Sequence, residues 1–393
     1  MQTFEYCVPT RIVFGKGSVE KLPAQLRLQG ASRVLVVYGG QSARKSGLLD
    51  RVFALLKESG VSFDTLGGVQ PNPLLSLARE GVKKAASMQA ELILAVGGGS
   101  VIDTAKAVAH GLANPDSDIW EFWTGKRALE KSMPVGVILT IPASGSETSD
   151  SAVLTDDAAL QKRGINTPFN RPAFAIMDPA LAATLPARQV ACGVTDIMMH
   201  TLERYFNPIG GNETTMQLAE AVLRVTVANG PAVCKDPGNL DAMSEIMWCG
   251  SLSHNGLTGL GGAKGLSVHP ISFALSEKYD IIHAEALSVL WPSWARYVYK
   301  ANPALFARYG KNVWGIDEPD EDKAALAAIA ASEDYFRSLG MPVSMAELSC
   351  GVQDEAGLEE LATRVSFGGT RRVGTLVSLD HAALREIFAM ANH

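Results

Sequence analysis

The stretch ELILAVGGGSVIDTAKAVA (residues 91–109) decides the fold class of this chain. It opens with an apolar run, passes through three glycines and continues with apolar residues at the three- and four-residue spacing of a helix. A short apolar run that ends in glycines is typical of a strand buried in a parallel sheet. We therefore predict a strand, a glycine-rich turn and a helix, which is the repeating unit of an α/β fold.

The same pattern recurs through the first half of the chain and then stops. Further strand-like runs occur at residues 33–40 (RVLVVYGG), 134–144 (PVGVILTIPAS) and 174–180 (FAIMDPA), with helical spacing between them. From about residue 189 onward, every segment carries helical spacing and no run resembles a strand. We predict an α/β domain over residues 1–187 and an all-helical domain over residues 188–393, with a cleft between them.

Composition narrows the class of protein. The chain has 393 residues, of which 47% are hydrophobic and 19% charged, as in ordinary globular proteins with a filled core. A formal net charge of −6 gives no electrostatic basis for binding nucleic acid or an anionic membrane. The five cysteines have no CxxC spacing, and the N-terminus has no signal-peptide pattern. We expect a cytoplasmic protein with reduced thiols.

The glycine turn of the opening stretch is a candidate phosphate site. Glycines let a phosphate approach the backbone, and the first amides of the following helix attract negative charge. The alternative is a tight turn that binds nothing, with the acid and base of the helix forming a solvated ion pair. The candidate residues are Gly97, Gly98, Gly99 and Ser100, with Asp103 and Lys106 one helical turn apart.

A second glycine turn bears on the choice between NAD(H) and NADP(H). Gly39, Gly40 and Ser42 follow the earlier strand, with Arg44 and Lys45 just beyond them. A carboxylate at this turn would bind a ribose hydroxyl and repel a 2′-phosphate. Because the turn has basic residues and no acid, we predict a preference for NADP(H), unless the basic residues only solvate a helix.

A third turn, from Thr140 to Ala152, is rich in hydroxyl groups that bind phosphate or amide, or simply cap turns.

Four residues of the second domain form a candidate metal site. Asp196 and His200 are four residues apart, so a helix puts both on one face. His269 and His283 are 14 residues apart, which is about 20 Å along a straight helix, so the segment KYDII must bend for both to reach one ion. One carboxylate and three imidazoles suit Fe²⁺ or Zn²⁺. Any one of these histidines alone is more often a core or surface residue.

Together these segments resemble a known family. The residues 97–109 (GGGSVIDTAKAVA), 140–147 (TIPASGSE), 177–203 and 269–292 are similar to those of the group III, iron-containing alcohol dehydrogenases. The most similar branch is that of the NADPH-dependent butanol dehydrogenases and aldehyde reductases. The resemblance covers nearly the whole chain and implies a dehydroquinate synthase-like architecture. In it, residues 1–187 would be a Rossmann-like α/β dinucleotide-binding domain and residues 188–393 an all-helical metal-binding domain.

The resemblance assigns roles to individual residues. It implies metal ligation, and through the metal catalysis, by Asp196, His200, His269 and His283. It implies cofactor contacts at Gly39, Gly40, Ser42, Gly97, Gly98, Gly99, Ser100, Asp103, Lys106 and Thr140.

Two positions depart from the family pattern. Many members have a histidine four residues after the third ligand, assigned to proton relay, and this chain has Phe273 there. Ser149 and Asp150 stand where close relatives have Asn and a small residue beside the substrate. The departures leave open the proton's route and the role of Asp150, which either selects a polar substrate group or faces solvent.

The predicted function is that of a metal-dependent alcohol dehydrogenase or aldehyde reductase. It would transfer hydride between NADP(H) and a short- to medium-chain alcohol or aldehyde, with one Fe²⁺ or Zn²⁺ as Lewis acid. The alternatives are a dehydroquinate synthase-type or glycerol dehydrogenase-type enzyme on the same fold. The resemblance also suggests a homodimer or larger homo-oligomer.

Overall fold

The computed structural model describes residues 3–40, 42–207, 212–263 and 265–393. Contacts along the chain divide it into two compact units. An α/β unit comprises Cys7–Leu185 and Pro237–Asn255. A helical unit comprises Met1–Tyr6, Pro186–Asp236 and Gly256–His393. None of the helices in the described residues has the length and hydropathy needed to cross a bilayer.

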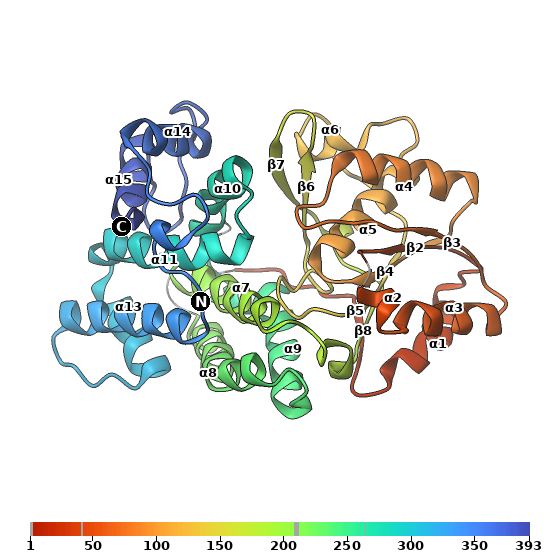
Figure 1. Cartoon of the computed structure of the whole chain (residues 1–393), viewed down its shortest axis with the longest axis horizontal. Helices are drawn as coiled ribbons and strands as arrows, with labels where there is room; N and C mark the ends of the chain where they lie inside the picture. The colour runs from red at the N-terminus through yellow and green to blue at the C-terminus, as the bar shows by residue number, and fades with distance from the viewer. Residues whose placement is uncertain (1–2, 41, 208–211, 264) are drawn as a thin grey trace. The chain divides into compact units, whose positions relative to one another are not determined.

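A six-stranded parallel sheet forms the centre of the α/β unit (Figure 1). Its strand order is β1-β8-β5-β4-β2-β3, and each neighbouring pair runs parallel. The strands are β1 (Arg11–Phe14), β2 (Arg33–Tyr38), β3 (Ser62–Leu66), β4 (Leu92–Gly97), β5 (Val135–Leu139) and β8 (Phe174–Met177). The predicted α/β fold with a parallel sheet is confirmed, and the four predicted strands are β2, β4, β5 and β8.

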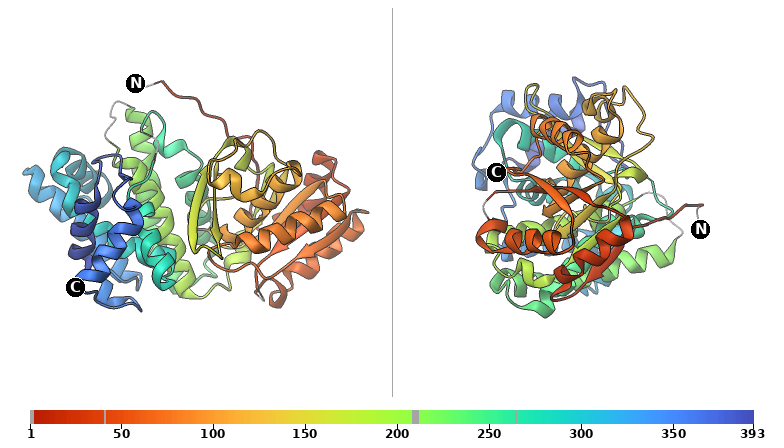
Figure 2. Two further views of the ribbon diagram at one scale, coloured as in Figure 1. Left: turned by 90° about the horizontal axis from the view of Figure 1, so that it is seen from above. Right: turned by 90° about the vertical axis from the view of Figure 1, so that its right-hand side faces the viewer.

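Helices cover both faces of this sheet (Figure 1). The helices α1 and α3 lie on one face and α4 and α5 on the other, an arrangement that can be followed from two further directions in Figure 2. The helices of this part are α1 (Leu22–Gln29), α2 (Ser42–Lys45), α3 (Leu48–Glu58), α4 (Leu75–Ser87), α5 (Gly99–Ala113) and α6 (Ile119–Trp123).

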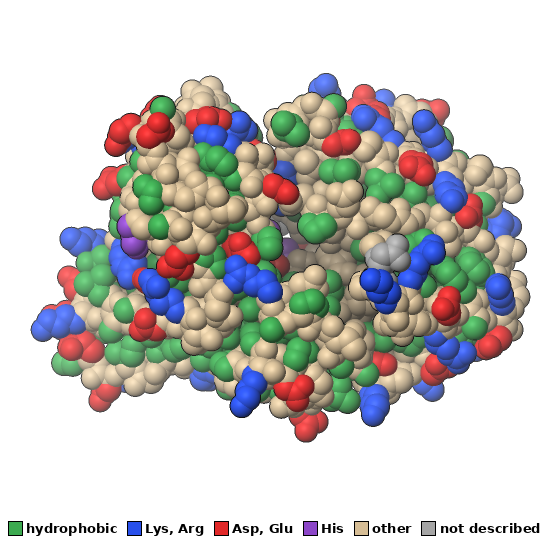
Figure 3. Space-filling view, viewed as in Figure 1, with side chains coloured by type: hydrophobic (Ala, Val, Ile, Leu, Met, Phe, Trp, Pro, Cys, Tyr) green, Lys and Arg blue, Asp and Glu red, His purple; other side chains and the backbone are tan. Residues whose placement is uncertain are grey.

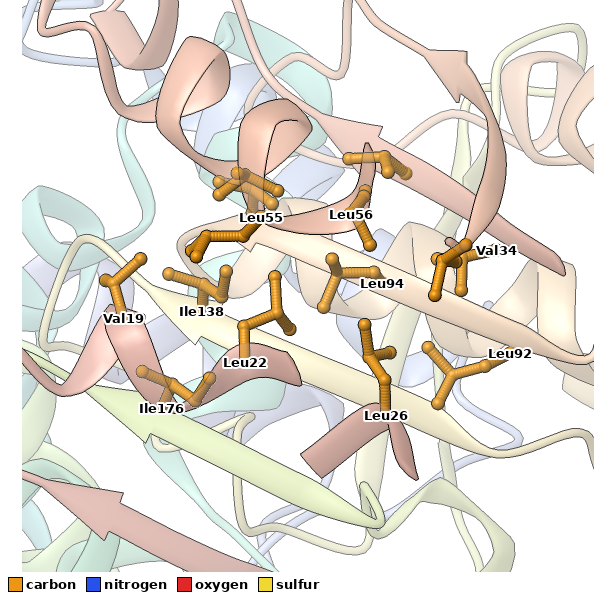
Figure 4. Packing of buried hydrophobic residues seen from close by; sticks show 14 of the residues in the cluster. Val19, Leu22, Leu26, Val34, Leu55, Leu56, Leu92, Leu94, Ile138 and Ile176 are labelled. Carbon is orange, nitrogen blue, oxygen red and sulfur yellow. The ribbon is translucent and has the colours of Figure 1, made fainter. Parts of the chain in front are cut away.

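A cluster of buried apolar side chains fills the space between α1, α3 and the sheet (Figure 4). Leu22 and Leu26 of α1 and Leu55 and Leu56 of α3 point toward side chains of the strands, among them Leu94. This burial removes apolar surface from water at about 25 cal/mol per Å² and holds the strands in register. The carboxyl ends of the strands are therefore a rigid platform for the glycine turns.

Four strands were not predicted from the sequence. Two of them, β1 and β3, are the edges of the sheet. They are four and five residues long and consist mainly of exposed and half-buried residues, so neither gives a long apolar run. The other two form an antiparallel hairpin, β6 (Ser151–Asp156) and β7 (Gln161–Asn166). Because β7 is largely polar, it gives no apolar pattern.

The second unit is built from helices, as predicted. They are α7 (Ala187–Tyr205), α8 (Glu213–Lys235), α10 (Val268–Tyr279), α11 (His283–Val298), α12 (Pro303–Tyr309), α13 (Glu321–Ser338), α14 (Glu355–Ser366) and α15 (His381–Ala391). An isolated bridge between Val373 and Leu379 is the β-type pairing in the described residues of this unit.

One helix departs from the predicted boundary at residues 187 and 188. Helix α9 (Leu240–His254) belongs to the α/β unit, although the sequence places it within the second domain. Polar contacts join α9 to the loop after β5. Ser251 donates a hydrogen bond to the carboxylate of Glu147, and His254 Nδ1 lies 2.6 Å from the carbonyl oxygen of Ser144.

Acidic and basic side chains are interspersed on the face drawn in Figure 3. This mixture agrees with the small net charge of the chain. An extended basic stripe, which nucleic-acid binding requires, is absent from that face.

Candidate metal and cofactor sites

Helix α7 carries Asp196 and His200 on one buried face. The two side chains are 8% and 4% exposed, and His200 Nδ1 lies 3.2 Å from Asp196 Oδ1. One donor atom each from Asp196, His200 and His269 lies within 4.8 Å of the others, and all three residues are buried. A carboxylate and two imidazoles at this spacing are a donor set suited to a divalent transition metal.

The turn between α10 and α11 brings the two distant histidines together. Helix α10 ends at Tyr279, and Asp280 adopts a left-handed conformation with φ of 54°, which turns the chain back. Aspartate is one of the few non-glycine residues that tolerate this region. The rings of His269 and His283 are consequently 5.1 Å apart, and His283 is half-buried at the start of α11.

Hydrogen bonding fixes the tautomer of His200. Its Nδ1 lies 2.9 Å from the carbonyl oxygen of Asp196, which can only accept a hydrogen bond, so Nδ1 carries the proton. The lone pair is therefore on Nε2, the nitrogen available to a metal.

The ring of His269 lies between two carboxylates. Its Nε2 is 3.6 Å from Asp196 Oδ1, and its Nδ1 is 3.1 Å from Glu203 Oε1. Within the described residues, neither ring nitrogen makes a well-aligned hydrogen bond, although both are buried. Burial lowers the pKa of His269, but Glu203 and Asp196 outweigh it and raise that pKa to about 9. A buried imidazole facing carboxylates in this way fits a site that holds a cation.

Glu203 is a residue of this site that sequence reasoning missed. It lies seven residues after Asp196, on the same face of α7, and is buried. The signal was present in the sequence, because Asp196, His200 and Glu203 follow the i, i+4, i+7 spacing of one helix face.

Phe273 stands beside the candidate metal site. Its ring is 5.9 Å from that of His283, and the residue is half-buried. A phenyl ring neither donates nor accepts a titrating proton, so this position supplies apolar surface.

The glycine turns of the α/β unit lie together at the carboxyl ends of the central strands. Strand β4 pairs with both β2 and β5, so the carboxyl ends of all three strands lie side by side. The amide of Thr140 donates to the carbonyl of Gly97 at 3.1 Å, which joins the third turn to the first. In this way the fold brings together the predicted cofactor residues Gly39, Gly40, Ser42, Gly97, Gly98, Gly99, Ser100 and Thr140.

The start of α5 is a candidate anion site. Among the described residues no side chain caps it, and its N-cap residue is Gly98. A Cβ added at Gly99 would lie 2.5 Å from Ser144 Oγ, so a larger residue would disturb the loop beside the turn. This glycine-lined helix start fits the phosphate of a dinucleotide.

Asp103 and Lys106 point into a buried polar network. Lys106 is fully buried and donates to Ser146 Oγ at 2.8 Å and to the carbonyl of Ser151 at 2.7 Å. Asp103 accepts from Ser146 Oγ at 2.6 Å and from the amide of Val153 at 2.9 Å. Burial lowers the pKa of Lys106 to about 8 and raises the pKa of Asp103. Their contact with a cofactor stays a prediction, and neither forms a solvated ion pair.

Asp150 is half-exposed and pairs with a buried base. Its carboxylate lies 3.4 Å from the guanidinium of Arg171, which also donates to the carbonyl of Thr148 at 2.6 Å. Asp150 is thus part of an ion pair that holds the loop between β5 and β6.

Comparison with known proteins identifies the family. Residues 9–179 match the family model described as iron-containing alcohol dehydrogenase, and residues 190–388 match the C-terminal model of the same family. The chain belongs to the iron-containing alcohol dehydrogenase family. It is accordingly an oxidoreductase that acts on alcohols or aldehydes, with a buried Asp196/His200/His269 metal site.

Relatives of known name support the membership. The chain is 37% identical to NADH-dependent butanol dehydrogenase A of Clostridium acetobutylicum over 390 residues, which cover 99% of each chain. It is 32% identical to the NADPH-dependent aldehyde reductase YqhD of Escherichia coli, with 100% of each covered. Among solved structures, NADH-dependent butanol dehydrogenase A of Thermotoga maritima superposes with a TM-score of 0.95 at 32% identity, covering 100% of this chain and 99% of that one.

Proposed function

We propose that this iron-containing alcohol dehydrogenase interconverts short- to medium-chain aldehydes and alcohols with NADP(H). The buried Asp196/His200/His269 cluster is the observation that carries the proposal. The names of relatives, which include butanol dehydrogenases and an aldehyde reductase, support the substrate class. We further propose that the enzyme works as a homodimer or larger homo-oligomer.

Each proposed site residue has a distinct task. When bound, a divalent cation such as Fe²⁺ or Zn²⁺ would act as a Lewis acid on the substrate oxygen, and a nicotinamide would exchange hydride with the adjacent carbon. We infer that Asp196, His200, His269 and His283 hold the cation. The glycine turns and Thr140 hold the cofactor.

The proposed preference for NADP(H) rests on the turn after β2. Gly40 brings no carboxylate to this turn, and Arg44 and Lys45 bring two positive charges. The guanidinium of Arg44 donates to the hydroxyl of Tyr38 and lies 5.2 Å from its ring centroid. A guanidinium placed in this way favours a 2′-phosphate. Relatives named for NADH and for NADPH both occur, so this turn is the feature to test.

Phe273 sets a condition on the proton. The substrate oxygen must gain or lose a proton in each turnover, and this side chain cannot carry it. We infer that the proton travels through water or a hydroxyl group.

The test is oxidation of NADPH, followed by absorbance, with butanal and protein loaded with Fe²⁺ or Zn²⁺. We expect metal-dependent turnover that His200→Ala abolishes while NADPH binding survives. The absence of turnover with any short aldehyde would overturn the proposal. Turnover with glycerol and NAD⁺ in its place would assign the glycerol dehydrogenase-type reaction.

A further inference from the structure

Glu203 is a buried carboxylate in the helical unit that has no part in the reaction as proposed so far. Its side chain is fully buried. Burying a carboxylate costs several kcal/mol unless hydrogen-bond donors surround it. The identity of its donors therefore indicates what this residue does.

Three nitrogen atoms of one short segment face the carboxylate. The amide of Ser267 donates to Oε2 at 2.7 Å, and the amide of His269 donates to Oε1 at 2.7 Å. The ring Nδ1 of His269 lies 3.1 Å from the same Oε1. One side chain of α7 thus contacts both the first turn of α10 and the side chain of its metal-site histidine.

These contacts do two separable things. The two amide bonds cap α10, whose own N-cap residue Ser267 provides no side-chain cap. A cap alone would contribute about 1 kcal/mol to stability and would not affect the ring. The third contact acts on the ring: Glu203 Oε1 lies 3.1 Å from Nδ1, whereas Asp196 Oδ1 lies 3.6 Å from Nε2, so the ring should keep its proton on Nδ1 when it gives up one to bind a cation through Nε2. That Nε2 faces Asp196 on the other side of the ring.

We propose that Glu203 is a positioning residue of the metal site, which fixes both the orientation and the tautomer of His269 toward the cation. The inference rests on the proposed function, since it presumes that a cation binds Asp196, His200 and His269. Helix α7 therefore positions all three of these residues. Asp196 and His200 are part of the helix, and Glu203 holds His269 by hydrogen bonding.

The test is metal affinity, measured on metal-free protein by titration with Co²⁺ in competition with a chelator. Glu203→Gln keeps the shape of the side chain but leaves one acceptor oxygen for three facing nitrogens. We expect this variant to bind Co²⁺ about 10- to 100-fold more weakly than wild type, with an altered visible absorption spectrum of the bound ion.

Glu220→Gln is the matched control. Glu220 is another buried carboxylate of the same unit, but it accepts from Tyr205 Oη at 2.8 Å and Arg308 Nε at 2.6 Å, and neither of these described partners is a proposed metal ligand. We expect this control to bind Co²⁺ as wild type does, even if both variants melt at lower temperature.

The outcomes separate this inference from the function on which it rests. Wild-type affinity and spectrum in Glu203→Gln, or an equal loss in Glu220→Gln, would overturn the positioning role alone. Failure of wild type itself to bind Co²⁺ would overturn the metal site and the positioning role with it. If Glu203→Gln does not fold, nitrogen NMR of histidine-labelled, Zn²⁺-loaded wild type decides: a proton on Nδ1 of His269 supports the role, and a proton on Nε2 overturns it.

Discussion

At the scale of single residues, a substitution at Gly40 is the direct test of the proposed preference for NADPH over NADH. Among the described residues, no atom lies within 4 Å of a Cβ built at this position, and its φ is not positive, so these surroundings leave space for a side chain. Gly40→Asp should lower kcat/KM for NADPH by about tenfold or more, because a carboxylate would repel a 2′-phosphate. Kinetics with both cofactors measure this, with Gly40→Ser as the uncharged control. Unchanged selectivity in Gly40→Asp would contradict the role of this turn.

Lys106 makes stability depend on pH in a window set by its burial. Burial lowers its pKa from 10.5 to about 8 in the folded state. Below pH 8 the buried amine is charged, and this charge lowers the stability of the folded state. Between about pH 8 and 10.5 the unfolded state binds more protons, so stability rises with pH. Relative to Lys106→Met, the free energy of unfolding of wild type should rise by about 1.4 kcal/mol for each pH unit across this window. Urea unfolding of both proteins from pH 7 to 10 measures it, and a pH-independent difference would argue against a neutralised amine.

At the scale of elements, the start of α5 depends on the absence of a side chain. Gly99→Ala would place a Cβ 2.5 Å from Ser144 Oγ and 3.3 Å from its Cβ, so the Ser144 side chain must turn away and the loop after β5 must shift slightly. We expect the Kd for NADPH to rise about tenfold and metal affinity to stay unchanged, as measured by fluorescence titration and chelator competition. Ser144→Gly in the same chain removes the clash and should restore much of the binding. A double variant as weak as Gly99→Ala would show that the loop is not the cause.

How far the sequence predicts an element follows from where that element lies. Strands β2 and β4 are buried along almost their whole length, so each was predicted from its apolar run. The edge strands β1 and β3 are mostly exposed or half-buried, and they were not predicted. Helix α9 has ordinary helical spacing, but its unit is decided by hydrogen bonds to a loop about 100 residues earlier.

The same distinction holds inside the candidate site. Asp196 and His200 share a helix face, so their spacing alone predicts that they meet. His269 comes 69 residues after His200, and local spacing cannot bring it there; its place in the site was predicted from the donor chemistry of the four residues together and from the family resemblance. Glu203 was legible as the next residue on that face, but a glutamate near the end of a helix ordinarily faces solvent.

At the scale of the whole molecule, each of the two units carries its own proposed ligand site. The metal cluster lies within the helical unit and the glycine turns within the α/β unit. A ligand that binds only the folded state stabilises it by about 2.7 kcal/mol at 100 times its Kd. Metal and NADPH should therefore stabilise the protein independently, since they bind different units.

His200→Ala tests that independence by calorimetry. Adding Zn²⁺ to metal-free wild type should raise Tm by several degrees, since about 1 kcal/mol corresponds to about 2–4 °C for units of this size. In His200→Ala the Zn²⁺-dependent rise should be lost, because one of the buried donors is gone, while the rise caused by NADPH should persist. The added Zn²⁺ should also leave the NADPH-dependent rise of the variant unchanged. A full Zn²⁺-dependent rise in His200→Ala would place the stabilising ion elsewhere, and loss of the NADPH-dependent rise would mean that the two units do not respond separately.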